Sequence, residues 1–377
     1  MNALIIGLGV FLTIPYVAWF LILIRYLDSN YTSPTLKQYA PADDEVSVII
    51  ATRNDDVSSC VNSLLRSRGV KEIIIVDDHS DDRTLKHLKE ISSIDNRIKL
   101  LYLNSEDSGK ASACQLGADK STCSILLFID ADTVVNDNAI ERAISLLKAN
   151  ELDAISVVGY LRCKDFDKVI TPFSFALLNA LVPIKDVANT KKKTGYFFGS
   201  FILIRRDSYV KIGGHRAVRG YILEDKALGE LAKASKLKIA IARGENLVSS
   251  EWAPGLSANI EALKRVLVPS MHGKKGWALA SSVAISLLFL LPLLTVALGL
   301  LNAYFAFIGF GSLFFEFIFN AYGSKNIGVS VLYSILFLLA EVILIIAFWR
   351  SLWISYRGGI VRWRGREYNY TAKQKIL

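Results

Sequence analysis

Long uncharged apolar runs at the two ends are the feature that most constrains how this chain can fold. Residues 3–24 contain no charged side chain and are long enough to cross the hydrocarbon core of a bilayer as a helix. A cleaved signal peptide is disfavoured, because no basic segment precedes this run and no small-residue cleavage site follows it. Two further apolar zones, residues 277–322 and 327–348, contain one acidic residue each. The chain therefore reads as a membrane protein with one large mixed segment between its apolar ends.

The distribution of Lys and Arg predicts the orientation, because short cytoplasmic loops carry an excess of both. Nothing basic precedes the first run, whereas Arg25 and Lys37 follow it, so the middle of the chain is predicted to be cytoplasmic. We expect five segments: an N-terminal transmembrane helix (1–26), a cytoplasmic domain (27–256), an interfacial segment (257–276), a C-terminal transmembrane region of two or three spans (277–349), and a basic cytoplasmic or interfacial tail (350–377).

The number of C-terminal spans stays open at this point. Residues 350–377 contain seven Lys and Arg and one acid, which favours a cytoplasmic tail and hence an even number of spans. Hydropathy alone suggests three, with two of them meeting near Leu301 and Asn302. We therefore expect part of residues 300–322 to be interfacial or re-entrant. The net charge of +9 predicts a membrane partner and no nucleic acid, since basic residues that flank spans face anionic lipid.

The middle of the chain alternates between short β-branched runs and segments with helical spacing. This alternation predicts right-handed crossovers and an α/β domain with a mostly parallel sheet, whose ligands bind at the carboxyl ends of the strands. The expected strands are residues 46–53, 72–80, 98–103 and 124–132, and the expected helices are 56–67, 82–92 and 109–120.

Acidic residues follow three of these expected strands. They are Asp55 and Asp56, Asp77 and Asp78, and the pair Asp130 and Asp132. A turn would explain any single pair, but three pairs at corresponding strand ends predict a site for a divalent cation and for hydroxyl groups. Hard oxygen ligands suit Mg²⁺ or Mn²⁺, which take their remaining ligands from water and phosphate. The sequence has no Gly-rich Walker loop, which argues against a P-loop nucleotide site.

The order of five short segments is similar to that of glycosyltransferase family 2, whose members use nucleotide-diphosphate sugars. The segments are "VSVIIATRNDD", "IIIVDDHSDDRT", "GKASACQLGA", "LLFIDADT" and "YILEDKALGELA". The C-terminal "VRWRGREY" resembles the tail of the ceramide-glucosyltransferase-like branch, membrane enzymes that glycosylate lipids. The resemblance covers roughly residues 45–275 and this tail. It implies a Rossmann-like GT-A catalytic domain with helical transmembrane segments at both ends.

The resemblance also implies roles for residues that match the family's motifs. Asp225 resembles the general base, and Glu224 is its competitor. Asp132 resembles the direct ligand of a Mg²⁺ or Mn²⁺ ion, with Asp130 as the second acid of the D-x-D pair. Gly199 and Ser200 resemble the acceptor-side segment. The residues implied for nucleotide binding are Ala51, Thr52, Arg53, Asp55, Asp78, Lys110 and Asp130.

The sequence departs from the family where many membrane members carry Gln/Arg-x-x-Arg-Trp. Arg265 can stand for the first position, but Val268 and Pro269 occupy the positions of Arg and Trp. The group that neutralises the diphosphate is then Arg265, the neighbouring Lys264, or the tail arginines, for which lipid headgroups are an alternative partner. These tail residues are Arg362, Arg364 and Arg366.

We therefore expect an inverting, metal-dependent hexosyltransferase that moves a sugar from a nucleotide-diphosphate donor, with UDP-hexose favoured, to a membrane lipid. A polyprenyl-phosphate sugar synthase and a polysaccharide synthase are alternatives among enzymes, although the missing Arg-Trp argues against the second. A nucleotide-sugar-binding membrane scaffold is the alternative outside enzymes. The apolar residues 171–184 are judged too short to span a membrane, and are expected to form a core helix or a membrane-facing wall near the acceptor.

Overall fold

The computed structural model describes residues 3–104, 108–136, 138–253, 255–271, 274–357, 360–363 and 366–369, of which 3–6, 8 and 360–369 are described by their backbone alone. The chain divides into two compact units. Within the described residues, the sheet unit comprises Thr32–Arg162 and Ile184–Glu251, and the helical unit comprises residues 3–31, Cys163–Pro183 and residues 252–369. The predicted segments placed residues 163–183 with the cytoplasmic domain, whereas they cluster with the terminal helices.

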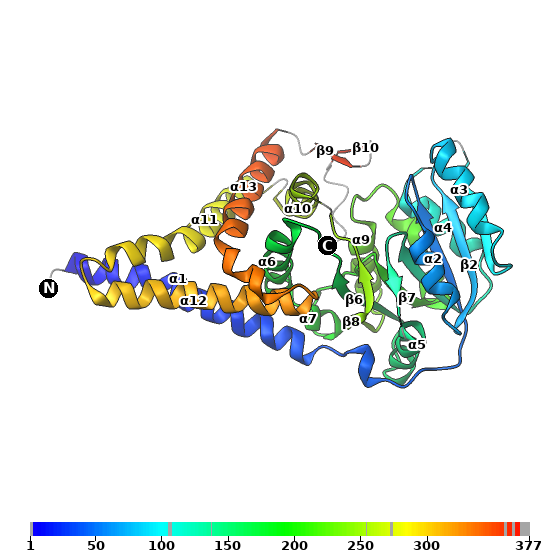
Figure 1. Ribbon diagram of the computed structural model, residues 1–377, viewed down its shortest axis with the longest axis horizontal. Coiled ribbons are helices and arrows are strands. Elements are labelled where there is room, and N and C mark those ends of the chain that lie inside the picture. Colours follow the sequence, from blue (N-terminus) through cyan, green and yellow to red (C-terminus); the bar gives the residue numbers. More distant parts are fainter. Residues whose placement is uncertain are drawn as a thin grey trace. The chain divides into compact units, whose positions relative to one another are not determined.

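The sheet unit is built on an eight-stranded sheet with the order β3-β2-β1-β4-β7-β6-β8-β5. β1, β2, β3 and β4 are parallel, and β6 is parallel to β8 (Figure 1). This confirms the α/β prediction. The strands are β1 (Val46–Thr52), β2 (Val70–Asp77), β3 (Ile98–Tyr102), β4 (Ile125–Asp130), β5 (Val134–Val135), β6 (Ala154–Leu161), β7 (Phe201–Arg205) and β8 (Ile239–Ser250).

The central strands are buried on both faces, which is why their sequences are continuous apolar runs. In β4, Leu127 and Ile129 pack into one hydrophobic cluster, and Leu126 and Phe128 pack into another. The helices that carry the first cluster are α2 (Ser58–Leu65), α3 (Asp82–Ser92) and α5 (Ala139–Ala149). Those that carry the second include α4 (Lys110–Lys120), α7 (Ile184–Ala188), α8 (Arg206–Lys211) and α9 (Glu224–Ala234). Short 3₁₀ helices, η1 (Leu36–Gln38) and η2 (Gly214–Val218), complete the unit.

β7 runs antiparallel to both of its neighbours, a reversal that the sequence did not predict. Ile129 of β4 pairs with Phe201, and Ile125 pairs with Arg205. The residues just before β7 therefore lie beside the carboxyl end of β4. The apolar "FILI" run forms the core of β7, which is buried over Phe201–Ile204.

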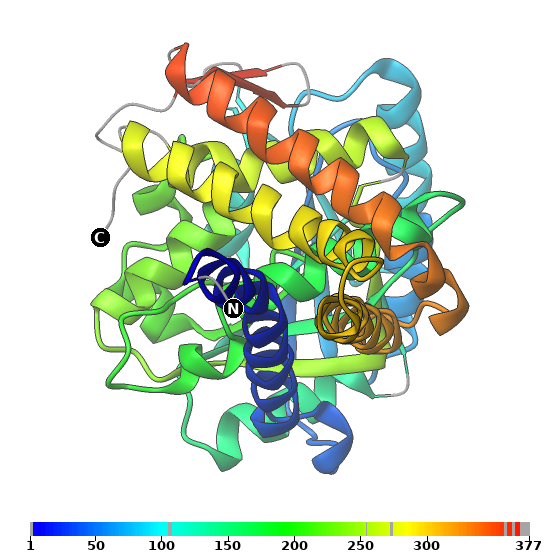
Figure 2. The ribbon, with the colours of Figure 1, turned by 90° about the vertical axis from the view of Figure 1, so that its left-hand side faces the viewer.

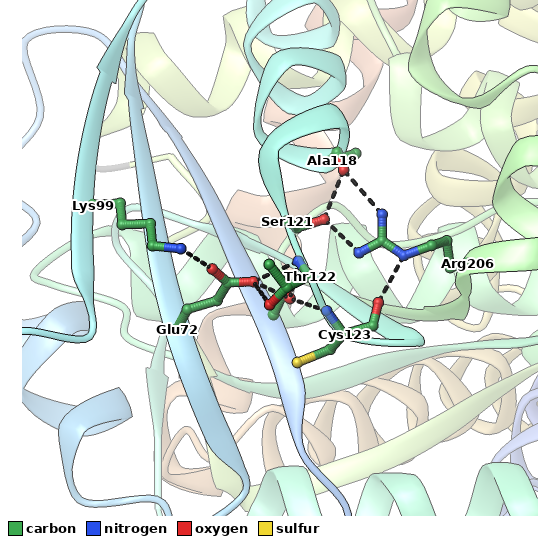
Figure 3. Close-up of polar contacts among 8 residues, drawn as sticks. Glu72, Lys99, Ala118, Ser121, Thr122, Cys123 and Arg206 are labelled. Atoms are coloured by element: carbon green, nitrogen blue, oxygen red, sulfur yellow. Dashed lines mark hydrogen bonds and ion pairs between the residues drawn. The ribbon is translucent and has the colours of Figure 1, made fainter.

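A buried polar cluster fixes the connection between α4 and β4. Glu72 of β2 accepts hydrogen bonds from Ser47 Oγ (2.6 Å), Thr122 N (2.6 Å), Thr122 Oγ1 (2.7 Å) and Lys99 Nζ (2.6 Å). Burial alone would raise the pKa of Glu72, but these hydrogen bonds lower it to about 2. On the other side of the same connection, Arg206 donates to the carbonyl oxygens of Cys123 and Ala118 (Figure 3). The cluster therefore fixes the end of α4 relative to the beginning of β4.

Counted over the described residues, five helices are long and apolar enough to cross a membrane, and they belong to the helical unit except for α7, which belongs to the sheet unit. They correspond to α1 (Ala3–Thr32, with Pro15 inside), α6 (Asp167–Leu181) together with α7, α11 (Lys275–Leu298), α12 (Ala303–Asn326), and η3 (Val331–Leu336) with α13 (Phe337–Tyr356). The unit also contains α10 (Leu256–Met271) and the two-stranded β9 (Ile360–Trp363) and β10 (Arg366–Asn369).

α6 does not cross a membrane, although the candidate segment Asp167–Ala188 is long enough. α6 by itself has 15 residues, and the segment reaches membrane-spanning length only together with α7, beyond the predicted residues 171–184. The strands on either side of α6 in sequence, β6 and β7, pair with each other in one sheet. A single crossing between them would place the two strands on opposite faces of the membrane. Since 72% of the segment is also buried, α6 is a core helix, as predicted.

α11 and α12 form an antiparallel hairpin whose turn lies at residues 299–302, where two spans were expected to meet. Gly309 allows the close approach of α12 to α11, because a Cβ there would lie 2.6 Å from Val296 N. α12 is continuous from Ala303 to Asn326, which argues against a re-entrant break in residues 300–322, whereas an interfacial location of part of them stays a prediction.

α13 begins and ends at the open end of this hairpin. Ser334, just before α13, lies 3.0 Å from Ser324 at the end of α12 (Oγ to Oγ). At its other end, the Tyr356 hydroxyl donates to the carbonyl oxygen of Lys275, the first residue of α11, at 3.4 Å. In Figure 2, α12 is seen nearly end-on while α13 runs across the view. α13 therefore bridges the hairpin and does not add a third pass along it.

Candidate active site

The carboxyl ends of the parallel strands meet at one edge of the sheet, as the sequence predicted. Ala51 pairs with Asp130 across β1 and β4, and Thr52 pairs with Asp77 across β1 and β2. The reversed β7 brings Gly199 and Ser200 to the same edge. Donor-side and acceptor-side candidates from distant parts of the sequence are therefore neighbours.

A lysine and two acids form the centre of this edge. Lys110, the first residue of α4, places its Nζ 2.6 Å from Asp130 Oδ1 and 2.9 Å from Glu224 Oε1. Burial would lower the pKa of Lys110, but Asp130, Glu224 and Asp225 outweigh it and raise the pKa well above its ordinary value. The lysine therefore stays charged and links the start of α4 to the start of α9.

Asp225 is held by two backbone amides. Gly199 N donates to its Oδ2 at 2.9 Å, and Lys226 N donates to its Oδ1 at 2.7 Å. Burial, followed by the charge of Glu224, raises the pKa of Asp225 to about 6, even though Lys110 acts in the opposite direction. A carboxylate that is fixed in place and titrates near neutrality has the properties of a general base. Glu224, by contrast, is engaged with Lys110.

Asp132 lies in the turn after β4, where Thr133 N donates to Asp130 O at 3.0 Å. Burial, followed by repulsion from Asp130, raises the pKa of Asp132 to about 7, against the opposing effect of Arg162. A bound divalent cation would relieve this repulsion, so the two acids fit a metal. Among the described residues no group of three or more His, Cys, Asp or Glu side chains could hold one. This protein would thus supply one or two ligands, with Asp132 the more available because Asp130 is paired with Lys110.

Two buried oxygens near the ends of β1 and β2 have no hydrogen-bond partner among the described residues. They are Thr52 Oγ1 and Asp77 Oδ1. Beside them, Asp78 accepts a hydrogen bond from Gly109 N at 3.1 Å. Gly109 has a φ of 97°, which favours glycine, and it turns the chain into α4. The Thr52 hydroxyl and the Asp78 carboxylate thus lie where the sequence placed nucleotide binding.

The structure does not bring every candidate residue to this centre. The Asp55 carboxylate accepts from Arg53 N at 3.1 Å, and Asp56 accepts from Ser58 N and Ser58 Oγ at the start of α2. Arg265 lies on α10, in the helical unit. Arg364 and the side chain of Arg362 lie outside the described residues.

Two residues at this edge were missed by the sequence reasoning. Arg162 follows β6 and Glu251 follows β8, and both act electrostatically on Asp132. Since β6 and β8 run parallel to β4, the rule that located the acids also locates these two. The signal was available in "AISVVGYLR", a β-branched run that ends in a charged residue.

Comparison with known proteins finds a family model that matches part of the chain. A model described as glycosyl transferase family 2 matches residues 47–213, which hold Asp78, Lys110, Asp130, Asp132 and Gly199. This match agrees with the prediction of a glycosyltransferase. The structure agrees with the predicted α/β domain and with apolar helices toward both ends of the chain.

Known proteins similar to this chain include two from staphylococci. A 4,4'-diaponeurosporenoate glycosyltransferase of Staphylococcus haemolyticus is 26% identical over 226 residues, which are 56% of this chain and 58% of that protein. One of Staphylococcus aureus is 22% identical over 349 residues, 87% of this chain and 89% of that protein. Among solved structures, a mannosyltransferase of Pyrobaculum calidifontis in complex with GDP-Man and Mn²⁺ has a TM-score of 0.48 and 15% identity, covering 91% of this chain and 99% of that one.

Proposed function

We propose that this glycosyltransferase moves a sugar from a nucleotide-diphosphate donor, with UDP-hexose favoured, to a membrane lipid, with inversion at the anomeric carbon. The observation that carries the proposal is the cluster of Lys110, Asp130, Asp132 and Asp225 at one sheet edge of a family 2 domain. The apolar helices that flank this domain in sequence, and relatives named for diaponeurosporenoate, support a lipid acceptor.

On the donor side, Thr52 and Asp78 would hold the base and ribose, together with the backbone around Ala51 and Arg53. The orphaned Thr52 hydroxyl supports this role, because a buried polar atom without a partner costs free energy until a ligand satisfies it. Asp132, assisted by Asp130, would hold a Mg²⁺ or Mn²⁺ ion, which neutralises the charge that develops on the leaving diphosphate.

On the acceptor side, Asp225 would remove the proton of the attacking hydroxyl. Its position is set by the amide of Gly199, and the missing side chain of Gly199 lets Lys110 and Asp225 lie close to the backbone there. The new bond forms on the face of the anomeric carbon opposite the departing diphosphate, so one displacement inverts the configuration. A carboxylate acceptor, which the names of the relatives give, is already anionic, so its attack would need no base and Asp225 would have no proton to remove.

The test uses the purified full-length chain in lipid nanodiscs with radiolabelled UDP-hexoses and GDP-mannose, native lipid extract, and Mn²⁺ or EDTA. We expect one sugar per lipid, transfer that stops in EDTA, and no transfer by Asp132→Ala. Equal transfer in EDTA would overturn the metal assignment, and products that lengthen with time would indicate a polysaccharide synthase. Asp225→Asn should abolish transfer to a hydroxyl but leave much of the transfer to a carboxylate or phosphate acceptor.

We also propose that the chain crosses the membrane three times, through α1, α11 and α12, with α13 lying at the cytoplasmic interface. Both ends of α13 lie at the end of the hairpin from which the chain enters α11, so the basic tail returns to that side. Exposed aromatic side chains gather around this end, as is typical of an interface. They are Trp277, Trp353 and Tyr356. This topology has two spans after the sheet unit, in agreement with the even number of C-terminal spans that a cytoplasmic basic tail requires.

Cysteine labelling distinguishes this topology from three full C-terminal crossings. Leu300→Cys, in the hairpin turn, and Arg357→Cys, after α13, are made singly in a Cys123→Ser, Cys163→Ser background, because the other two cysteines are buried. A membrane-impermeant maleimide should reach the two positions from opposite sides of sealed vesicles. Labelling of both from the same side would show that α13 crosses.

A further inference from the structure

Arg162 lies beside the turn after β4 that carries Asp132, and the ends of β6 and β8 hold it there. It directly follows β6, and its backbone N donates to Ser250 O of β8 at 2.8 Å. Its Nη1 donates to Ser249 O at 3.2 Å and to Ser249 Oγ at 3.1 Å, while Nη2 donates to the carbonyl oxygen of Asp132. The guanidinium is therefore held between the end of β8 and the turn that carries the proposed metal ligand.

The charges around Asp132 leave Arg162 as the available cation. The positive charges of Arg162 and Lys110 both oppose the rise in the pKa of Asp132, but Lys110 is paired with Asp130 and Glu224. The hydrogen bonds of Arg162 go to neutral oxygens, not to a carboxylate. Three of its five N–H donors make these bonds among the described residues, which leaves two donors and a full positive charge for a ligand. The side chain is half-buried, so it is accessible at this edge.

We propose that Arg162 binds the diphosphate of the sugar donor and replaces the arginine that the C-terminal family motif lacks here. The proposal rests on the proposed nucleotide-diphosphate donor. A diphosphate held by a metal ion at Asp132 would lie next to the Asp132 carbonyl oxygen, to which Arg162 donates a hydrogen bond. An arginine suits this place because its planar fork can hold the turn and donate to phosphate oxygens at once.

A purely structural role for Arg162 makes a different prediction. If the residue only held the Asp132 turn, its loss would weaken the binding of the metal itself. If it binds the diphosphate, its loss removes a positive charge, so Mn²⁺ alone should bind as well as before or better. Binding of a nucleoside diphosphate should weaken while binding of the matching monophosphate changes little, because the second phosphate is the group that Arg162 contacts.

The experiment compares wild type with Arg162→Gln and Arg162→Lys, all as full-length protein in nanodiscs. The matched control is Arg142→Gln, since Arg142 also donates to a carbonyl oxygen, that of Tyr39 at 2.7 Å, but lies on α5. Binding of Mn²⁺ alone is measured by electron paramagnetic resonance. Binding of UDP, UMP, GDP and GMP with Mn²⁺ is measured by calorimetry.

We expect Arg162→Gln to weaken binding of the preferred diphosphate roughly ten- to hundredfold, the value of a charge-assisted hydrogen bond. Arg162→Lys should be intermediate, and Arg142→Gln should match wild type. Equal loss for diphosphate and monophosphate, or loss of Mn²⁺ binding, would overturn the proposal in favour of a structural role. If Arg162→Gln fails to fold, an unchanged preference for diphosphate over monophosphate in Arg162→Lys overturns it. Wild type that binds neither diphosphate would instead refute the proposed donor.

Discussion

Replacing Gly199 by alanine should slow the reaction without destabilising the fold. A Cβ at this position would lie 2.9 Å from Lys110 Nζ and 3.1 Å from Asp225 Oδ2. Ordinary contact begins at 3.4 Å, so the ammonium group must move by about 0.5 Å. The φ of Gly199 is not in the left-handed region, so alanine adds no backbone strain.

The expected size of the effect follows from this displacement. A misplacement of 1 Å in an active site can cost about a hundredfold in rate, so 0.5 Å should cost roughly tenfold, or about 1.4 kcal/mol in the barrier. Stability should change little, because the end of a lysine side chain moves easily.

The assay pairs initial transfer rates with melting temperature for Gly199→Ala and a control, Gly229→Ala. At Gly229 in α9 an added Cβ would overlap the backbone of Tyr196, which cannot move as easily. The control should therefore lose stability first and activity only as a consequence. A full rate in Gly199→Ala, or a rate that falls only in step with its melting temperature, would refute the reasoning.

Three further predictions concern groups whose pKa values are shifted. Glu72→Gln should lower the free energy of unfolding by roughly 3 kcal/mol at neutral pH, and the melting temperature by roughly 6–12 °C, without changing the preferred donor. Because the pKa of Glu72 is lowered to about 2, this stabilisation is present above about pH 4.5 and is lost as the pH falls toward 2, which acid unfolding of wild type and variant would reveal. With a hydroxyl acceptor, kcat/KM should fall about tenfold per unit below pH 6 as Asp225 is protonated; a flat profile would exclude it as the base. Lys110→Met should shift this fall in kcat/KM to higher pH, since Lys110 lowers the pKa of Asp225.

Much of the site could be predicted from the sequence because one geometric rule governs it. Parallel strands end at the same edge, so alternation along the chain is enough to place Asp78 and Asp130 at one edge of the sheet. The same rule did not set Asp56 apart from the other acids. Its carboxylate accepts a hydrogen bond from Ser58 N at the start of α2, and the order of the strands does not predict the direction of a side chain. Arg162 was within reach of the rule, but the strand that carries it was not recognised.

The direction of an element was harder to predict than its existence. The apolar run of β7 reads the same in either direction, so its reversal depends on its neighbours, and so does the position of Gly199. Hydropathy found α13 but could not show that both its ends lie at one end of the α11–α12 hairpin. For α6, the charged Asp167 and Lys168 hid the first turn of the helix from a search for uncharged runs.

The reversal of β7 has a consequence for how such an enzyme can change its acceptor. Because β6 ends and β7 begins at the same edge, the stretch from Arg162 to Ser200 leaves the sheet and returns to it at one place. That stretch contains α6, which belongs to the helical unit, and it ends in the residues beside Asp225. Because its two ends meet, it can be exchanged as a single segment, provided that Ile184, Val187 and Phe197, which pack into the second hydrophobic cluster, are kept. Chimaeras joined at Arg162 and Phe201 are the natural way to transplant acceptor preference between members of the family.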